Sequence, residues 1–170
     1  MVASQNRTAS EVGAKVLADG GNAVDAAVAV GFTLAVTVPR AGNIGGGGFM
    51  LVHDAASGDT TAIDYRETAP LGATRDMYLD ADGNVDPSLS RFGHKAAGVP
   101  GTVAGMYLAH QKSGRLPWKQ VLQPAVDLAR DGIVVTKDYS DQTTYYRDRL
   151  CQQQASCDYF LKAGGEPYQQ

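Results

Sequence analysis

The chain passes from a predicted helix into a predicted strand through Ala41-Gly-Asn-Ile-Gly-Gly-Gly-Gly-Phe-Met50. Four consecutive glycines suggest a loop that binds phosphate through its backbone amides. A dinucleotide loop, however, follows a strand and opens a helix, and a Walker loop needs a lysine after its glycines. Here the order is helix and then strand, and Phe49 and Met50 follow the glycines. The stretch is therefore predicted to serve close backbone packing where a sheet begins.

Two helices are predicted before this glycine stretch. Thr8-Ala-Ser-Glu11 fits a capping box with its threonine as the N-cap, and Gly20-Gly21 ends that helix. Asn22 caps a second helix over roughly residues 23–37, with Asp25 near its positive end. The second helix is apolar on all sides, which predicts that it is buried.

A β-hairpin is predicted at residues 48–65. Its strands are Phe49-Met-Leu-Val52 and Thr60-Thr-Ala-Ile63, and Asp54-Ala-Ala-Ser-Gly58 forms the turn between them. The first strand is apolar on both faces, so both faces are expected to be covered. Because two strands are a marginal unit, we expect further strands from elsewhere.

The second half of the chain alternates irregular and helical segments. Residues 70–98 carry many turn formers and predict an irregular excursion. Pro100 and Pro117 each predict the start of a helix, and the second of these helices ends at Asp131-Gly132. Residues 145–170 are polar, and no closing element is predicted there.

Composition excludes several classes of partner. The net charge is −3, from 15 basic and 18 acidic residues, and no basic stripe indicates nucleic-acid binding. The longest apolar run, Ala26 to Val38, is shorter than the roughly 20 residues of a membrane span. Met1-Val-Ala-Ser4 does not begin a signal peptide. The two cysteines, Cys151 and Cys157, can form either a short disulfide loop or two free thiols.

No metal or cofactor is predicted from the residues. Asp80-Ala-Asp-Gly-Asn-Val-Asp86 spaces its oxygen atoms like the start of a calcium loop, but Val85 and Arg91 occupy the positions that need glycine and glutamate. A surface Asp-Gly turn is therefore the better interpretation. The three histidines share no metal-ligand spacing, and no Gly-x-Ser-x-Gly elbow is present.

Arg66 is the candidate binding residue. It lies in Ile63-Asp-Tyr-Arg-Glu-Thr-Ala-Pro70, where the second strand ends, and strand ends and loops often carry ligand contacts. Its guanidinium can bind a carboxylate through two parallel hydrogen bonds. On the residues alone, a surface or ion-paired arginine is the competing interpretation.

Several long motifs resemble, in order, the γ-glutamyltranspeptidase family. The resemblance covers about residues 8–132. The motifs are Asp19-Gly-Gly-Asn-Ala-Val-Asp-Ala-Ala-Val-Ala-Val30, the glycine stretch 41–50, Thr60-Thr-Ala-Ile-Asp-Tyr-Arg-Glu-Thr-Ala-Pro70, Gly98-Val-Pro-Gly-Thr-Val-Ala-Gly105 and Pro124-Ala-Val-Asp-Leu-Ala-Arg-Asp-Gly132.

This resemblance implies an α+β fold that is part of the αββα sandwich of an N-terminal nucleophile hydrolase. Such enzymes are made as a precursor that cleaves itself into a large and a small subunit. The new N-terminal threonine attacks the γ-amide of glutathione or another γ-glutamyl compound. Water or an acceptor amine then resolves the acyl-enzyme, so that the outcome is hydrolysis or transfer.

The resemblance also assigns roles within residues 1–170, which correspond to the N-terminal segment of the large subunit. Arg66 matches the arginine of the family's Asp-Tyr/Phe-Arg-Glu motif, which binds the α-carboxylate of the γ-glutamyl group. The nucleophile's Thr-Thr-His block is not found here. The segment is therefore expected to be inactive without the rest of the large subunit and the small subunit, and no catalytic residue is assigned to it.

Two alternatives stay open at this point. A cephalosporin or glutaryl acylase of the same family also presents a carboxylate to an arginine. A non-catalytic fragment or homologue is the other alternative. The family resemblance further implies a periplasmic or secreted protein, exported with a signal peptide.

Overall fold

The most deeply buried helix is α2 (Ala23–Thr37), in agreement with its apolar sequence. In the computed structural model, which describes residues 1–170, the Asn22 side chain accepts hydrogen bonds from the Val24 and Asp25 N–H groups. The Asp25 carboxylate accepts the Asn22 N–H at 2.9 Å and completes a capping box. Val28 and Thr33 are fully buried. The predicted bounds, N-cap and burial of this helix are confirmed.

Helix α1 (Arg7–Ala18) packs against α2, but its predicted N-cap is wrong. Asn6, not Thr8, caps the helix, and its side-chain oxygen accepts the Ala9 N–H at 3.2 Å. Asparagine caps at least as well as threonine, so a start at Asn6 is as favourable and lengthens the helix. Glu11 consequently forms an exposed ion pair with Arg7 instead of reaching back to the cap.

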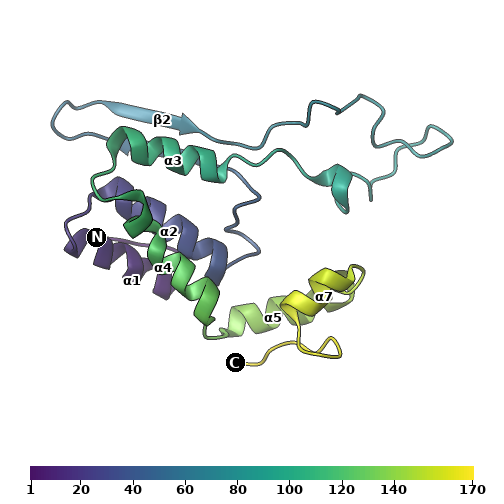
Figure 1. Cartoon of the computed structure of the whole chain (residues 1–170). Coiled ribbons are helices and arrows are strands. Elements are labelled where there is room, and N and C mark those ends of the chain that lie inside the picture. Colours follow the sequence, from purple (N-terminus) through teal and green to yellow (C-terminus); the bar gives the residue numbers. More distant parts are fainter. The chain divides into compact units, whose positions relative to one another are not determined.

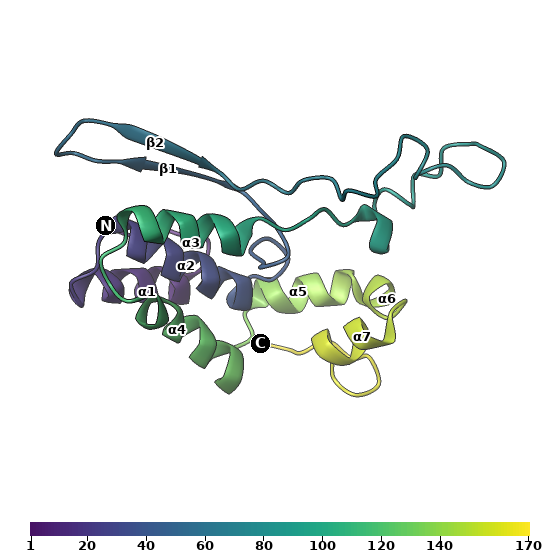
Figure 2. The ribbon, with the colours of Figure 1, turned by 45° about the horizontal axis from the view of Figure 1, so that its top comes forward.

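The hairpin consists of β1 (Phe49–His53) and β2 (Thr60–Asp64), paired antiparallel with Met50 opposite Ile63. Gly48 and Tyr65 exchange both backbone hydrogen bonds, so the ladder extends over the predicted residues 48–65. Figures 1 and 2 show the hairpin over α3, with α2 and α1 beyond α3.

The two faces of the hairpin differ. Met50, Val52 and Ile63 pack on the helical core, whereas Phe49 and Leu51 on the other face are 64% and 75% exposed. The prediction that both faces of the first strand are covered is wrong for residues 1–170. Apolar composition on both sides of a strand indicates a need for cover, but it does not say which element supplies the cover.

Two further helices close the core. Helix α3 (Thr102–Ser113) begins two residues after Pro100, and α4 (Trp118–Asp131) begins directly after Pro117. Trp118 packs edge-on against Phe32 of α2 and Tyr107 of α3, with ring centroids 5.7 and 5.1 Å apart. The core side chains are Val16, Val24, Ala26, Val28, Ala29, Phe32, Ile63, Met106, Ala109, Val121 and Ala125.

Asp25 joins α2 to the connection between α3 and α4. Its carboxylate is fully buried and accepts the N–H groups of Arg115 and Leu116, at 3.0 and 3.3 Å. His110 Nε2 donates to the Leu116 carbonyl oxygen at 2.8 Å, so this histidine has a structural role. The Asn22 side chain also donates to the carbonyl oxygen of Ser113.

Between the hairpin and α3 the chain is irregular, as predicted, apart from the short helix η1 (His94–Ala96). Figure 1 shows this excursion extending away from α1, α2 and α3. Its Asp80–Asp86 segment is a turn in which Asp80 accepts the N–H groups of Asp82 and Asn84, and Gly83 has a φ of 81°. The carboxylate organises backbone there, as the surface-turn interpretation predicts.

The chain divides into two compact units, Met1–Val126 and Asp127–Gln170. The second unit contains α5 (Lys137–Tyr145), α6 (Arg147–Leu150) and α7 (Gln154–Phe160). The chain ends without a closing element after α7, as predicted, but α6 and α7 within residues 145–170 were not predicted. The helices α6 and α7 are too short to give a periodic apolar pattern.

A disulfide between Cys151 and Cys157 joins α6 to α7 and decides the alternative that the sequence left open. The Arg147 Nε donates to the Gly165 carbonyl oxygen at 2.7 Å, which holds the segment after α7 against α6. Leu161, only 2% exposed, is the largest fully buried side chain of this unit. Covalent and charge-assisted contacts thus supplement a small apolar core.

We expect Asp25→Ala to lower the free energy of unfolding by about 3 kcal/mol, because backbone N–H groups of Asn22, Arg115 and Leu116 lose their acceptor in a buried place. Denaturant unfolding of the protein measures this. Asp19→Ala, which removes only an exposed ion pair with Lys15, should change stability by less than about 1 kcal/mol. Equal effects of the two substitutions would contradict the role given to Asp25.

The disulfide predicts that the non-reduced protein is lighter than the reduced protein by the mass of two hydrogen atoms. Alkylation without a reductant should leave both cysteines unmodified, because no free cysteine is present. Mass spectrometry of the alkylated protein checks this. Modification of Cys151 or Cys157 in the absence of reductant would show that the bridge does not form in solution.

Candidate functional site

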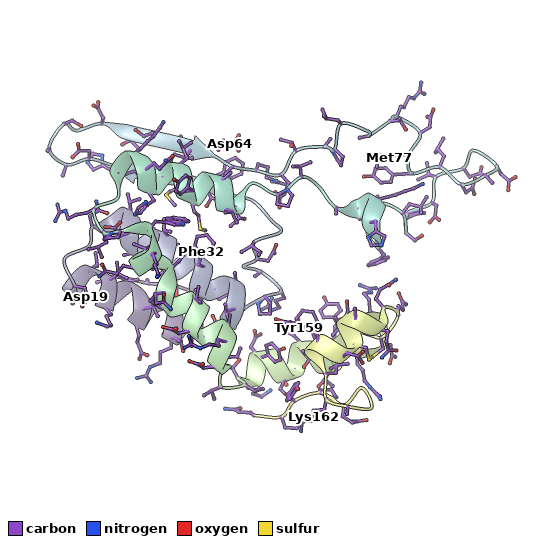
Figure 3. The ribbon with its side chains drawn as sticks, in the orientation of Figure 1. Asp19, Phe32, Asp64, Met77, Tyr159 and Lys162 are labelled. Atoms are coloured by element: carbon purple, nitrogen blue, oxygen red, sulfur yellow. A yellow bond between two sulfur atoms is a disulfide. The ribbon has the colours of Figure 1, made fainter.

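Arg66 lies immediately after β2, where the hairpin ladder ends. The Asp64 side chain accepts the Arg66 N–H at 2.9 Å and so fixes the local turn of the backbone. Figure 3 shows Asp64 at the end of β2, where the chain leaves the hairpin in the direction of Met77. The predicted place of Arg66 at the end of the second strand is therefore confirmed.

The Arg66 side chain is 68% exposed, and its guanidinium Nε lies 3.2 Å from Glu67 Oε2. The side chain of the preceding residue, Tyr65, packs against α3 at Gly105. Because successive side chains of an extended chain point to opposite sides, Arg66 projects away from α3, on the face of the hairpin that carries Phe49 and Leu51. The guanidinium is thus presented on the uncovered face.

Two glycine-containing segments flank the backbone that carries Arg66. The Gly46 carbonyl oxygen accepts the N–H groups of Gly101 and Thr102, at 2.9 and 3.0 Å. Thr68 and Val99 exchange two backbone hydrogen bonds. The glycine stretch before β1, the strand end after β2 and the residues before α3 therefore meet in one place.

The approach of these backbones requires glycine at particular positions, which we call the glycine cradle (Gly47, Gly48, Gly101 and Gly105). A Cβ atom on Gly47 would lie 2.5 Å from the Tyr65 carbonyl oxygen. A Cβ atom on Gly101 would overlap that same oxygen, and one on Gly105 would overlap the Tyr65 Cβ and Cγ atoms. Larger residues cannot occupy these positions without moving the strand end.

Two of the four consecutive glycine N–H groups in this stretch bond to backbone carbonyl oxygens of the chain. The Gly48 N–H donates to the Tyr65 carbonyl oxygen and the Gly46 N–H to that of Asn43, at 3.3 and 3.4 Å. These donors are satisfied within the chain, so they are not directed at an anion. The packing role predicted for this stretch is confirmed.

Electrostatically, the strand end combines a neutral phenol with a cation. Burial raises the pKa of the Tyr65 phenol above its ordinary value, because desolvation disfavours the phenolate. The phenol therefore stays neutral at physiological pH and does not compete for the positive charge of Arg66. Chemically, the exposed guanidinium can bind an anion such as a carboxylate.

The other chemistry-bearing residues serve the fold. His53 Nδ1 lies 3.1 Å from Thr60 Oγ1 on the opposite strand, and the Thr143 hydroxyl donates to the Tyr139 carbonyl oxygen at 2.9 Å. No group of three or more His, Cys, Asp or Glu side chains is arranged to hold a metal ion. None of the helices is long and apolar enough to span a membrane.

Sequence reasoning identified Arg66 but missed the cradle residues beyond the glycine stretch. Gly101 and Gly105 are four residues apart, at the start of α3, so they share one helix face. A pair of glycines at this spacing indicates that another backbone or ring approaches that face. That signal was present in the sequence, but it does not identify Tyr65 as the approaching residue.

Comparison with known proteins identifies the family. The family model described as gamma-glutamyltranspeptidase matches residues 9–170. The chain therefore belongs to the γ-glutamyltranspeptidase family. The α+β fold class predicted from the sequence is confirmed by the structural relatives of this family.

Among particular relatives, the chain is 52% identical over 167 residues to the glutathione hydrolase proenzyme of Escherichia coli K12, covering 98% of this chain and 29% of that protein. It is 46% identical over 168 residues to the glutathione hydrolase proenzyme of Bacillus subtilis 168, covering 98% and 28%. The chain thus spans less than a third of the length of these relatives.

Solved structures of this family also resemble the chain. The Helicobacter pylori gamma-glutamyltranspeptidase superimposes with a TM-score of 0.96 and 48% identity, covering 100% of this chain and 48% of that one. A cephalosporin acylase from Bacillus halodurans superimposes with a TM-score of 0.79 but only 25% identity, covering 94% and 30%. The chain is therefore more similar to the first of these two proteins.

Proposed function

We propose that residues 1–170 are the N-terminal segment of the large subunit of a γ-glutamyltransferase, also called a glutathione hydrolase. The full-length protein cleaves the γ-glutamyl amide bond of glutathione and related compounds, and transfers the γ-glutamyl group to water or an acceptor amine. Within this activity, Arg66 binds the α-carboxylate of the γ-glutamyl group. The observation that carries the proposal is the exposed Arg66, held at the strand end by the glycine cradle in a chain of this family.

The geometry of Arg66 supports this assignment. Its Nε lies 3.2 Å from Glu67 Oε2, and the side chain is 68% exposed. A guanidinium edge with two parallel N–H groups matches the two oxygens of a carboxylate. A γ-glutamyl group differs from an ordinary acyl group by its free α-amino and α-carboxylate groups, so binding of that carboxylate gives selectivity.

The bond-breaking step belongs to residues outside this segment. The nucleophile is the N-terminal threonine of the small subunit, which forms a γ-glutamyl-threonine acyl-enzyme and uses its own amine as base. Thr60 contacts His53 on the opposite strand, and Thr143 donates to Tyr139 within α5. The segment is therefore inactive by itself, and its partners are the remainder of the large subunit and the small subunit from the same precursor. The proenzyme names of the relatives support this division.

We further infer a periplasmic or secreted location. The Cys151–Cys157 disulfide supports this inference, because disulfides persist in oxidising compartments and are rare in the cytosol. The glutaryl or cephalosporin acylase alternative is less well supported, since the acylase relative is only 25% identical. Parallel assays of the full-length protein on glutathione and on a glutaryl-cephalosporin separate the two activities.

Arg66→Lys in the full-length protein should raise KM for γ-glutamyl-p-nitroanilide at least about tenfold, because lysine keeps the charge but loses the two-bond geometry. Arg66→Gln, which also removes the charge, should raise it further. The kcat should change less than KM, since Arg66 binds a group remote from the scissile amide. Steady-state release of p-nitroaniline measures both constants.

Arg75→Lys is the matched control, because Arg75 is an almost fully exposed arginine of the irregular excursion. Its substitution should leave both constants within about twofold. Unchanged KM in Arg66→Lys and Arg66→Gln would remove Arg66 from the binding site. An equal rise in the Arg75 variant would show that the effect is not specific to the strand end.

A further inference from the structure

We propose that Gly48 and Gly105 are positioning residues for Arg66, and that they act through the Tyr65 side chain. This inference rests on the carboxylate-binding role proposed for Arg66. It adds a requirement beyond that role: binding of the γ-glutamyl carboxylate by Arg66 depends on the absence of a side chain at two other positions.

The Tyr65 side chain packs between Gly48 and Gly105, where neither neighbour has a side chain that could move aside. On the β1 side, a Cβ atom on Gly48 would lie 3.1 Å from Tyr65 Cε2 and 3.3 Å from Cζ. On the α3 side, a Cβ atom on Gly105 would overlap Tyr65 Cβ and Cγ. The ring and the root of the side chain therefore rest directly on backbone at both positions.

The glycine within α3 points to a geometric requirement. Glycine inside a helix is less favourable than alanine, because it loses more backbone freedom on folding. Gly105 lies inside α3 (Thr102–Ser113) and is buried. Alanine would favour the helix at this position, but only glycine leaves room for Tyr65.

A displacement of Tyr65 is transmitted directly to Arg66. The Tyr65 backbone is bonded to Gly48, and the Arg66 N–H is bonded to the Asp64 side chain at 2.9 Å. Further along, Thr68 is bonded to Val99. The backbone is thus bonded at Tyr65 and at Thr68. A shift of the Tyr65 ring is therefore expected to tilt the short segment between these two residues, which contains Arg66.

Two-bond recognition of a carboxylate is sensitive to such a tilt. A binding group must be held within about 0.5 Å of its productive position to keep its full effect. An added methyl group at Gly48 requires the Tyr65 ring to move by a few tenths of an ångström, and this shift is of the same order as that positional tolerance. The added methyl should therefore weaken carboxylate binding while the fold is retained.

The first test is Gly48→Ala in the full-length protein, assayed with γ-glutamyl-p-nitroanilide. We expect KM to rise about three- to tenfold with kcat within about twofold, since the guanidinium is displaced but the reacting groups are not. Gly105→Ala should have a larger effect, and Gly48→Ala keeps the inference testable if the Gly105 variant does not fold. Gly72→Ala is the control, because a Cβ atom there meets open space. Unchanged KM in Gly48→Ala would overturn the inference.

The second test asks whether the effect passes through Tyr65 and Arg66. In a Tyr65→Leu background, the ring atoms that a Cβ on Gly48 would meet are absent, so Gly48→Ala should raise KM no further. In an Arg66→Gln background, Gly48→Ala should also have no further effect, because the positioned group is already lost. The same fold-change in KM in all backgrounds would show an action independent of Arg66 and would overturn the inference.

The two proposals fail in distinguishable ways. If Arg66→Gln leaves KM unchanged, the carboxylate-binding role is wrong and the positioning role falls with it. If Arg66→Gln raises KM but Gly48→Ala does not, only the positioning role is wrong. Thermal unfolding of each variant shows whether the substitution destabilises the whole protein. The kinetics give a second control, because unfolded enzyme lowers the active fraction and hence the apparent kcat, but does not selectively raise KM.

Discussion

The backbone from Tyr65 to Glu67 passes so close to two other segments that side chains are excluded between them. Gly47 approaches the Tyr65 carbonyl oxygen from the β1 side, and Gly101 approaches the same oxygen from the start of α3. This contact ties together the hairpin, the glycine stretch and α3, which are far apart in sequence. The position of Arg66 follows from it, since Arg66 lies in the enclosed segment.

A second set of contacts holds the other end of α3. There the buried Asp25 carboxylate accepts backbone N–H groups of Arg115 and Leu116, while Asn22 donates to Ser113. The capping box that starts α2 therefore also fixes the end of α3. With backbone contacts at both ends, α3 connects the apolar core around α2 to the strand end.

The local elements could be predicted because their causes are local. The apolar α2 with its Asn22 cap and the hairpin at 48–65 each follow from spacing within a short window. The N-cap of α1 was assigned to Thr8 because Glu11 follows it at the capping-box spacing, although Asn6, two residues earlier, is the more favourable cap.

The errors and gaps share a different cause, namely dependence on partners distant in sequence. The glycines before and within α3 are explained by Tyr65, some 40 residues away, and no periodicity links the two. Exposure of Phe49 and Leu51 likewise depends on which element covers the strand, and α6 and α7 are joined by the Cys151–Cys157 bridge, which the sequence left open. For Arg66, the sequence predicted its place at the end of the second strand, and the family resemblance implied the carboxylate-binding role. The packing of the glycine cradle around this strand end became visible only in the structure.

The exposure of Arg66 determines how much binding energy it can supply. An ion pair between groups surrounded by water contributes at most about 1 kcal/mol, because water screens the charges and the side chain loses freedom. A charge-assisted bond in a water-excluded site contributes about 1.5–3 kcal/mol. In the proposed function, the apolar Phe49 and Leu51 beside Arg66 give a surface on which a covering element could exclude that water. This segment would then supply the geometry of carboxylate recognition, while the strength of carboxylate binding depends on the rest of the protein.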